Sequence, residues 1–136
     1  MTITARKALA TALTAFVVGT AALAAPAHAG SFSINLQPRN ADEDRAMRAG
    51  LGIYALVNAV QSGSIRQIGS GNSAGLAQNG SGNLGSVHQE GQGHSGTLTQ
   101  NGNGNSYGLF QFGRNTNSHV TQNGNGGTGA TFQFGW

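Results

Sequence analysis

The sequence predicts an all-β fold, a β-solenoid of stacked 22-residue strand-turn-strand-turn coils with cross-β, amyloid-forming geometry. The main observation is a glutamine that returns every eleven residues between residues 67 and 133. A glycine follows each glutamine by two residues, and an aliphatic residue precedes the first six glutamines by two. A fixed period of this kind is typical of repeat architectures. The glutamines are Gln67, Gln78, Gln89, Gln100, Gln111, Gln122 and Gln133.

The other two repeated positions explain how such a unit would fold. Because a strand alternates its side chains between two faces, the aliphatic residue and the glutamine share one face. We therefore expect the aliphatic side chains to point inward: Ile65, Leu76, Val87, Leu98, Leu109 and Val120, with Thr131 in the last unit. Glycine takes a positive φ readily and can reverse the chain. The expected turn glycines are Gly69, Gly80, Gly91, Gly102, Gly113, Gly124 and Gly135.

The units alternate between two kinds, which sets the period at 22 residues. The residue after the glutamine is Asn79, Asn101 or Asn123 in the even units. In the odd units it is Ile68, Glu90, Phe112 or Phe134. One coil therefore contains two strands and two turns, and the seven units form about three and a half coils.

The amide side chains are the expected source of cohesion. Identical glutamines and asparagines in stacked strands form hydrogen-bonded ladders at a strand spacing of about 4.7–4.8 Å. A second ladder position lies five residues after the glutamine, at Asn72, Asn83 and Asn105, with His94, Thr116 and Gly127 in the other units. The seven glutamines and three asparagines are thus the predicted stacking and polymerisation residues. The last strand has neither proline nor charge to protect its edge, which predicts an open edge where another copy docks.

The outward side of the odd units changes along the stack from charged to aromatic. It begins with Arg66 and Ile68 and continues with His88 and Glu90. The last two odd units carry Phe110, Phe112, Phe132 and Phe134. An exposed apolar patch usually marks a contact surface, so these four predict an exposed aromatic face for lateral packing or adhesion. The alternative is a simple β-propensity preference for phenylalanine.

The first residues predict export. Arg6 and Lys7, an apolar run over residues 8–24 and the small-x-small triplet ending at Ala29 form a secretory signal peptide, residues 1–29. A single N-terminal membrane helix is the alternative. Without those two basic residues, 7 − 2 = 5 basic residues face four acidic ones, so no clustered basic face for nucleic acid is expected. The chain contains no cysteine, so disulfides cannot hold the fold.

Residues 30–61 form an N-terminal leader before the repeat array at 62–136. Alternating Phe32, Ile34 and Leu36 predict a short strand or an extended segment. A helix is expected over residues 41–60, with Asn40 as its cap and acidic residues in the first turn. A strand over residues 53–60 is the alternative.

The segment from Gln67 to Gln78 reads Q-x-G-x-G-N-x-A-x3-Q and resembles the curlin repeat of bacterial curli subunits. The resemblance covers about residues 64–136. It implies a secreted structural subunit that reaches the cell surface through the periplasm and self-assembles into extracellular amyloid fibres for adhesion and biofilm matrix. The implied partners are further copies, a nucleator subunit and an outer-membrane secretion machinery. The sequence departs from the family pattern at Gln61, where the family has serine, and at the three replaced asparagines.

Other functions find little support in the residues. Three G-x-G-x-x-G windows lack the strand-loop-helix context of a dinucleotide site, and the array holds no aspartate for calcium. His88, His94 and His119 lie at different phases of the repeat, which argues against a metal site. Glu90 is the only carboxylate of the array, so paired acid–base chemistry is not expected there, and the chain is expected to be no enzyme and to have no catalytic residue. No cofactor is expected, and the protein is not expected to be an integral membrane protein. The alternative function is a monomeric secreted β-solenoid that binds a ligand, surface or ice, although Ala77, Thr99 and Thr121 give an incomplete threonine column.

Overall fold

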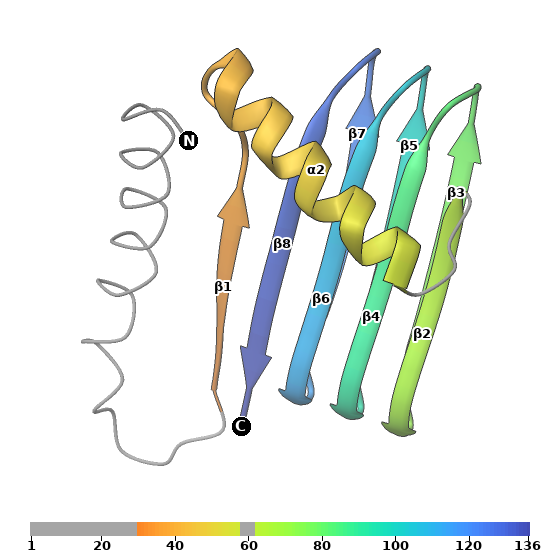
Figure 1. The fold of residues 1–136 in the computed structure, drawn as a ribbon. Helices are drawn as coiled ribbons and strands as arrows, with labels where there is room; N and C mark the ends of the chain where they lie inside the picture. Colours follow the sequence, from red (N-terminus) through yellow and green to blue (C-terminus); the bar gives the residue numbers. More distant parts are fainter. Residues whose placement is uncertain (1–29, 58–61) are drawn as a thin grey trace.

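The computed structural model describes residues 30–57 and 62–136, which form a two-layered β-solenoid with one helix (Figure 1). The predicted fold class is confirmed. The signal peptide and residues 58–60 of the expected helix lie outside the described residues. The elements are β1 (Ser31–Leu36), α2 (Ala41–Val57), β2 (Gly63–Ser70), β3 (Ser73–Asn79), β4 (Leu84–Gln92), β5 (Ser95–Asn101), β6 (Ser106–Arg114), β7 (Asn117–Asn123) and β8 (Thr128–Gly135).

The seven repeat strands alternate between two sheets. One sheet has the order β1-β8-β6-β4-β2 and the other β3-β5-β7. Strands β2, β4, β6 and β8 are parallel and in register at an offset of 22 residues, so that Gln67 pairs with Gln89 and Gln111 with Gln133. The second sheet keeps the same offset. The predicted 22-residue coil is therefore the structural repeat.

The core lies between the two sheets and is narrow. Val87 and Leu109 from one sheet and Leu98 from the other are fully buried and form one apolar cluster with Tyr107. Aliphatic side chains two positions before the glutamines thus meet across the interior. Burial of a side chain of this size stabilises a fold by roughly 1.5–3 kcal/mol, so the apolar part of the core is small and its polar part matters.

The turn glycines are required by backbone conformation and by close contact between coils. Gly91 has a φ of 132°, a region that side-chain-bearing residues rarely adopt. A Cβ atom on Gly91 would lie 1.9 Å from the carbonyl oxygen of Gly113 in the next coil. The glycine columns therefore let successive turns stack as closely as the strands do.

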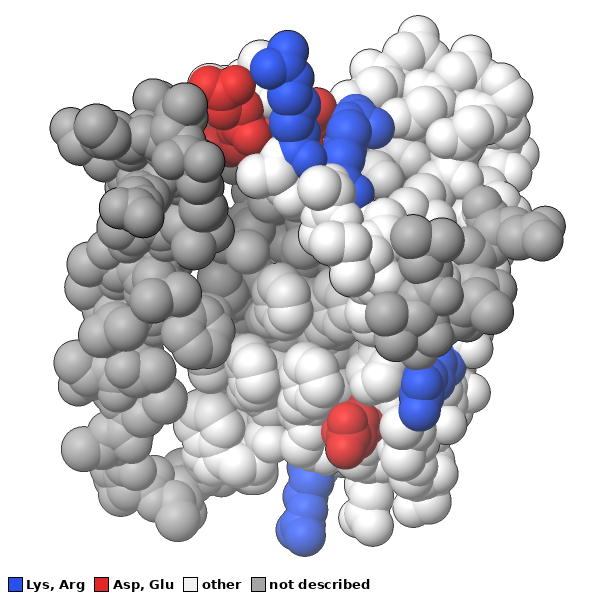
Figure 2. All heavy atoms as spheres, in the orientation of Figure 1, with Lys and Arg blue, Asp and Glu red and all other residues white. Residues whose placement is uncertain are grey.

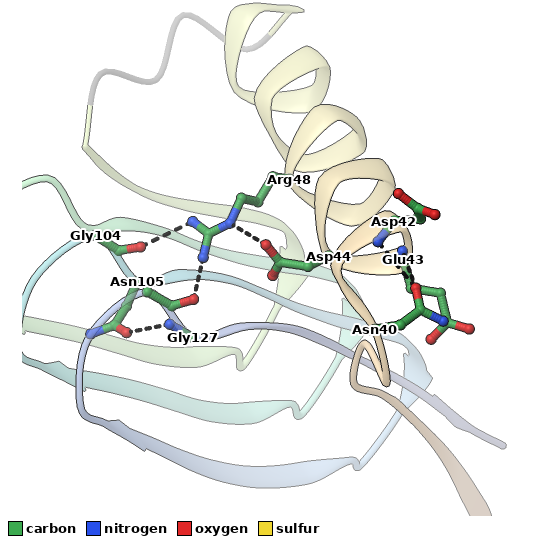
Figure 3. A network of polar contacts seen from close by, with 9 residues as sticks. Asn40, Asp42, Glu43, Asp44, Arg48, Gly104, Asn105 and Gly127 are labelled. Atoms are coloured by element: carbon green, nitrogen blue, oxygen red, sulfur yellow. Dashed lines mark hydrogen bonds and ion pairs between the residues drawn. The ribbon is translucent and has the colours of Figure 1, made fainter.

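Helix α2 begins where the sequence predicts. The Asn40 side-chain oxygen accepts hydrogen bonds from the backbone N–H groups of Asp42 (3.1 Å) and Glu43 (2.9 Å) (Figure 3). Glu43 in turn accepts the backbone N–H of Arg39 at 2.8 Å. This reciprocal arrangement satisfies donors that the first turn leaves unpaired. The helix continues to Val57, so the strand alternative for residues 53–57 is wrong.

Strand β1 covers the edge that the sequence predicts to be open. It pairs antiparallel with β8, from Ser31 opposite Gly135 to Leu36 opposite Ala130. The rings of Phe32 and Phe134 stack at a centroid distance of 5.1 Å. The open-edge prediction is therefore wrong for the five-stranded sheet. The residues 31–36 do form the short strand, but its partner lies about a hundred residues away and no local pattern reveals it.

Helix α2 crosses the outer face of the five-stranded sheet (Figure 1). Leu51 packs with Phe110 and Ala130, and Met47 and Tyr54 pack around them. The Tyr54 ring meets Phe110 edge to face at 5.3 Å and 89°. The prediction of an exposed aromatic face is corrected as follows: Phe110 is 8% exposed, and Phe112, Phe132 and Phe134 are half-buried. Phe110, Phe112 and Phe132 belong to the surface on which the helix packs, whereas Phe134 stacks on Phe32 of β1.

Charged side chains are sparse on this side of the molecule. In Figure 2 several acidic and basic side chains lie at the start of α2, and few are seen over the sheet. The distribution agrees with the near balance of five basic and four acidic residues after residue 29.

Candidate functional site

The odd glutamines form a continuous hydrogen-bonded column through the stack. The Nε2 group of Gln67 donates to Oε1 of Gln89 at 2.8 Å. The same contact joins Gln89 to Gln111 at 2.8 Å and Gln111 to Gln133 at 2.9 Å. Gln89 and Gln111 are fully buried. The column joins all four repeat strands of the larger sheet.

Three of these amides also connect the two sheets. The second N–H of Gln89 donates to the backbone carbonyl of Ser73 at 2.8 Å, and that of Gln111 to Ser95 at 3.0 Å. Gln133 does the same to Asn117 at 3.0 Å. A buried glutamine with both donors and its acceptor in use avoids the cost of an unpaired polar group, about 1–3 kcal/mol.

The even glutamines repeat the arrangement in the three-stranded sheet. Gln78 donates to Oε1 of Gln100 at 2.8 Å, and Gln100 to Gln122 at 2.9 Å. In both columns the donor belongs to the earlier coil and the acceptor to the later one. The columns therefore have a direction: Oε1 atoms face the N-terminal end of the stack and Nε2 groups face the C-terminal end.

The asparagines five residues after the glutamines join coils through the backbone and not through one another. The Asn83 side chain donates to the carbonyl of Gly102 at 2.9 Å and accepts the backbone N–H of Asn105 at 3.0 Å. Asn105 repeats this with Gly124 at 2.8 Å and Gly127 at 2.9 Å. Asn72 likewise accepts the backbone N–H of His94. These side chains hold each turn to the turn of the next coil.

Comparison with known families gives the same interpretation. Residues 61–91 match the family described as the curlin associated repeat. The match covers 31 of the 136 residues and, over that stretch, confirms the resemblance seen in the sequence. No curated protein and no solved structure matches the chain.

One repeat unit replaces the asparagine by a histidine that makes comparable contacts. His94 is 1% exposed, and its Nε2 lies 3.2 Å from the carbonyl oxygen of Glu90. A carbonyl oxygen only accepts, so Nε2 carries the hydrogen. The Nδ1 atom then accepts from the hydroxyl of Thr116 at 2.8 Å. The His94–Thr116 pair thus takes the place that asparagine side chains occupy in other repeat units.

The two ends of the stack differ from its middle. Ile65 continues the column of Val87 and Leu109 by register but is 45% exposed. The inward position expected of Ile65 is therefore not a buried one. Leu76 and Val120 are half-buried. An end strand has a neighbour on one side only, which leaves its core side chain partly in solvent.

A second polar cluster joins α2 to the turns of the repeat units (Figure 3). Arg48 pairs with Asp44 at 2.9 Å and donates to the carbonyl of Gly104 at 3.0 Å. It also donates to the carbonyl of Gly126 in the next coil along. The i, i+4 spacing of Asp44 and Arg48 is visible in the sequence, but the carbonyl groups that Arg48 reaches are not.

Asp44 is the acidic member of this cluster. Arg48 donates a hydrogen bond to the Asp44 carboxylate. The Thr128 hydroxyl lies beside the same carboxylate, although without a hydrogen bond of ordinary geometry. Thr128, which has the larger effect, and Arg48 together lower the pKa of Asp44 below its ordinary value of 3.8. The contact between helix and turns therefore favours the charged carboxylate.

Neither a membrane span nor a metal cluster emerges from the described part of the chain. Among residues 30–57 and 62–136, no helix is long and apolar enough to cross a membrane. The same residues contain no group of three or more histidine, cysteine, aspartate or glutamate side chains that could hold a metal ion.

Proposed function

We propose that this curlin-repeat chain is a secreted structural subunit, and not an enzyme, that polymerises into extracellular curli-like amyloid fibres. Such fibres would serve surface adhesion and biofilm matrix. The subunit would pass through the periplasm and an outer-membrane secretion machinery, and a nucleator subunit would start its assembly.

One observation supports this proposal above the others: a single chain already holds a cross-β lattice. Each repeat strand lies in parallel register with the strand 22 residues away, and buried glutamine columns join the coils. Identical side chains stacked in this way are the basis of amyloid cohesion. Further copies extend the lattice without any new kind of contact.

The experiment is to incubate purified residues 30–136, which include every described element, at rest and with seeds of preformed product. We expect binding of an amyloid dye, a fibre reflection at about 4.7–4.8 Å, and faster growth when seeds are added. The matched control is Gln111→Pro, which removes a ladder donor in a central strand and should not form or extend fibres. A wild-type chain that stays folded and monomeric under all conditions contradicts the proposal.

The alternative function, a monomeric secreted β-solenoid that binds a ligand, surface or ice, is favoured by a different observation. Strand β1 covers the β8 edge and α2 covers the phenylalanines, both of which oppose association. It predicts a stable monomer in sedimentation, with thermal hysteresis or saturable binding to a surface. Seeded fibre growth contradicts it.

A further inference from the structure

The number of repeat strands is odd, which restricts how copies can stack. Along the chain the strands alternate between the sheets, so that the larger sheet holds β2, β4, β6 and β8 and the smaller one β3, β5 and β7. The next vacant position of the lattice therefore lies beside β7, in the smaller sheet. The position after that lies beside β8, where β1 now pairs.

Within the described residues 30–57 and 62–136, several features show that the position beside β7 is vacant. A groove of about 780 Å³ lies there, between β7 on one side and β1 and β8 on the other. A Cβ on Gly102 would meet the carbonyl of Gly124 at 1.9 Å, whereas one on Gly124 meets nothing within 4 Å. Val120 is only half-buried. The β7 edge has the groove, the open turn and the partly exposed core residue that an added strand needs.

Strand β2 of a second copy fits this groove. Continuing the eleven-residue lattice places its Ile65 over Val120, its Gln67 over Gln122 and its Gly69 over Gly124. Ile65 is 45% exposed and would be covered. The Nε2 group at the end of the even column would face Oε1 of Gln67, which is the direction of every other step in the columns.

A direct translation of the copy does not fit the lattice. Placing β2 of the second copy beside β8 would leave the position beside β7 empty at every junction, because the smaller sheet has one repeat strand fewer. Empty strand positions leave backbone donors and acceptors unpaired. Placing β2 beside β7 fills both positions, since β3 then follows beside β8.

We propose that a second copy of this chain docks by its β2 strand on the β7 edge, rotated by about half a turn, and that β1 is a lock which its β3 strand must displace from β8. This inference rests on the proposed function. Strand β1 has Ser33 opposite Gln133 and cannot continue the glutamine column. The incoming β3 brings Gln78 to that place. Docking thus exchanges an antiparallel strand with a serine opposite Gln133 for a parallel strand with a glutamine there.

The first experiment locates the junction with engineered disulfides, because the chain has no cysteine of its own. In the half-turn arrangement Arg66 of one copy lies beside Thr121 of the next, and in direct translation it lies beside Phe132. Fibres of Arg66→Cys with Thr121→Cys should oxidise to covalent multimers on a non-reducing gel. Fibres of Arg66→Cys with Phe132→Cys should not. The reverse result, or multimers from neither pair, overturns the half-turn docking.

The second experiment tests whether β1 must leave β8 by linking the two strands covalently. Gly30 and Trp136 exchange backbone hydrogen bonds of 3.2 and 3.0 Å, so by alternation Asn35 and Thr131 form a non-hydrogen-bonded pair, the closer kind. A disulfide between Asn35→Cys and Thr131→Cys should therefore hold β1 on β8 while leaving the glutamine column intact. We expect the oxidised protein to lose seeded elongation and the same protein to regain it on reduction. Equal elongation in both states overturns the lock.

Failures of the two proposals give different results. If the wild-type chain and the reduced staple variant both form no fibres, the proposed function and the docking inference fall together. If both form fibres and the oxidised variant elongates equally well, the fibre function stands and only the lock falls. Hydrogen exchange at β1 amides adds an independent measurement: protection should be present in the monomer and lost in the fibre.

Discussion

Ser33 lies directly opposite Gln133, so the amide column that passes from Gln89 through Gln111 ends against a side chain that cannot extend it. The strand that carries Ser33 satisfies the backbone edge of β8 and leaves the side-chain column unfinished. A natural edge strand is usually protected against further pairing. Here the protection comes from the chain's own N-terminal segment, and it is specific to one of the two sheets.

The buried glutamine column should contribute measurably to the stability of the single chain. Gln111→Ala removes a donor to Gln133 and an acceptor for Gln89, and leaves the Ser95 carbonyl without its side-chain partner. We expect a loss of about 1–3 kcal/mol in the free energy of unfolding, measured by urea denaturation. Gln92→Ala is the matched control because Gln92 is exposed at the end of β4, and it should change stability by less than about 0.5 kcal/mol. Equal losses would argue against the column.

The histidine in place of asparagine gives a second prediction. His94→Asn should retain stability within about 1 kcal/mol, because asparagine fills the equivalent position in adjoining units and can satisfy the same backbone groups. His94→Ala removes the imidazole partner of the buried Thr116 hydroxyl and of the Glu90 carbonyl and should cost about 1–3 kcal/mol. Thermal unfolding of the two variants and the wild type separates these outcomes. Equal destabilisation by both substitutions would show that the imidazole itself is needed.

The repeat could be predicted because its information is local and periodic. Glutamine, glycine and aliphatic positions recur in phase, and the 22-residue alternation fixes both the strands and their register. The Asn40 cap and the first-turn acids similarly predict the start of α2. The pairing of Ser33 with Gln133 and the contact of Leu51 with Phe110 join segments far apart in the sequence. Neither contact repeats along the chain, so the periodicity of the sequence does not indicate these contacts. For this reason the sequence alone predicts that the phenylalanines are exposed.

Packing of α2 on the aromatic residues should depend on Leu51. This side chain is 8% exposed and packs with Phe110. Leu51→Ala should destabilise the docked helix by about 2 kcal/mol or more, measured as faster hydrogen exchange of the α2 amides. Ile53→Ala is the matched control on the same helix, because Ile53 is 63% exposed. Equal effects of the two substitutions would contradict the observed packing.

Acid should loosen the contact between α2 and the turns. The folded-state pKa of Asp44 lies below its ordinary value of 3.8, so its ionisation favours the folded contact. That contribution is complete above the ordinary value and is lost as the pH falls through the lower, folded-state value. Amide exchange rates in α2, normalised to those of an unfolded peptide, should therefore rise as the pH falls below about 4. Asp44→Asn should flatten this dependence, whereas Asp42→Asn, an exposed neighbour in the same turn, should leave it. An unchanged profile in Asp44→Asn would assign the effect elsewhere.

The glycines of the even turns distinguish stability of the chain from growth of a fibre. Gly102 and Gly124 have similar φ values of 118° and 109°, so an alanine at either site meets similar backbone strain. A Cβ on Gly102 would also lie 1.9 Å from the Gly124 carbonyl, whereas on Gly124 it meets nothing within 4 Å. Gly102→Ala should therefore destabilise the monomer more than Gly124→Ala in urea denaturation. If Gly69 of the next copy stacks over Gly124, Gly124→Ala should nevertheless prevent seeded elongation. Elongation of Gly124→Ala at the wild-type rate would show that no copy packs on the β7 end of the stack.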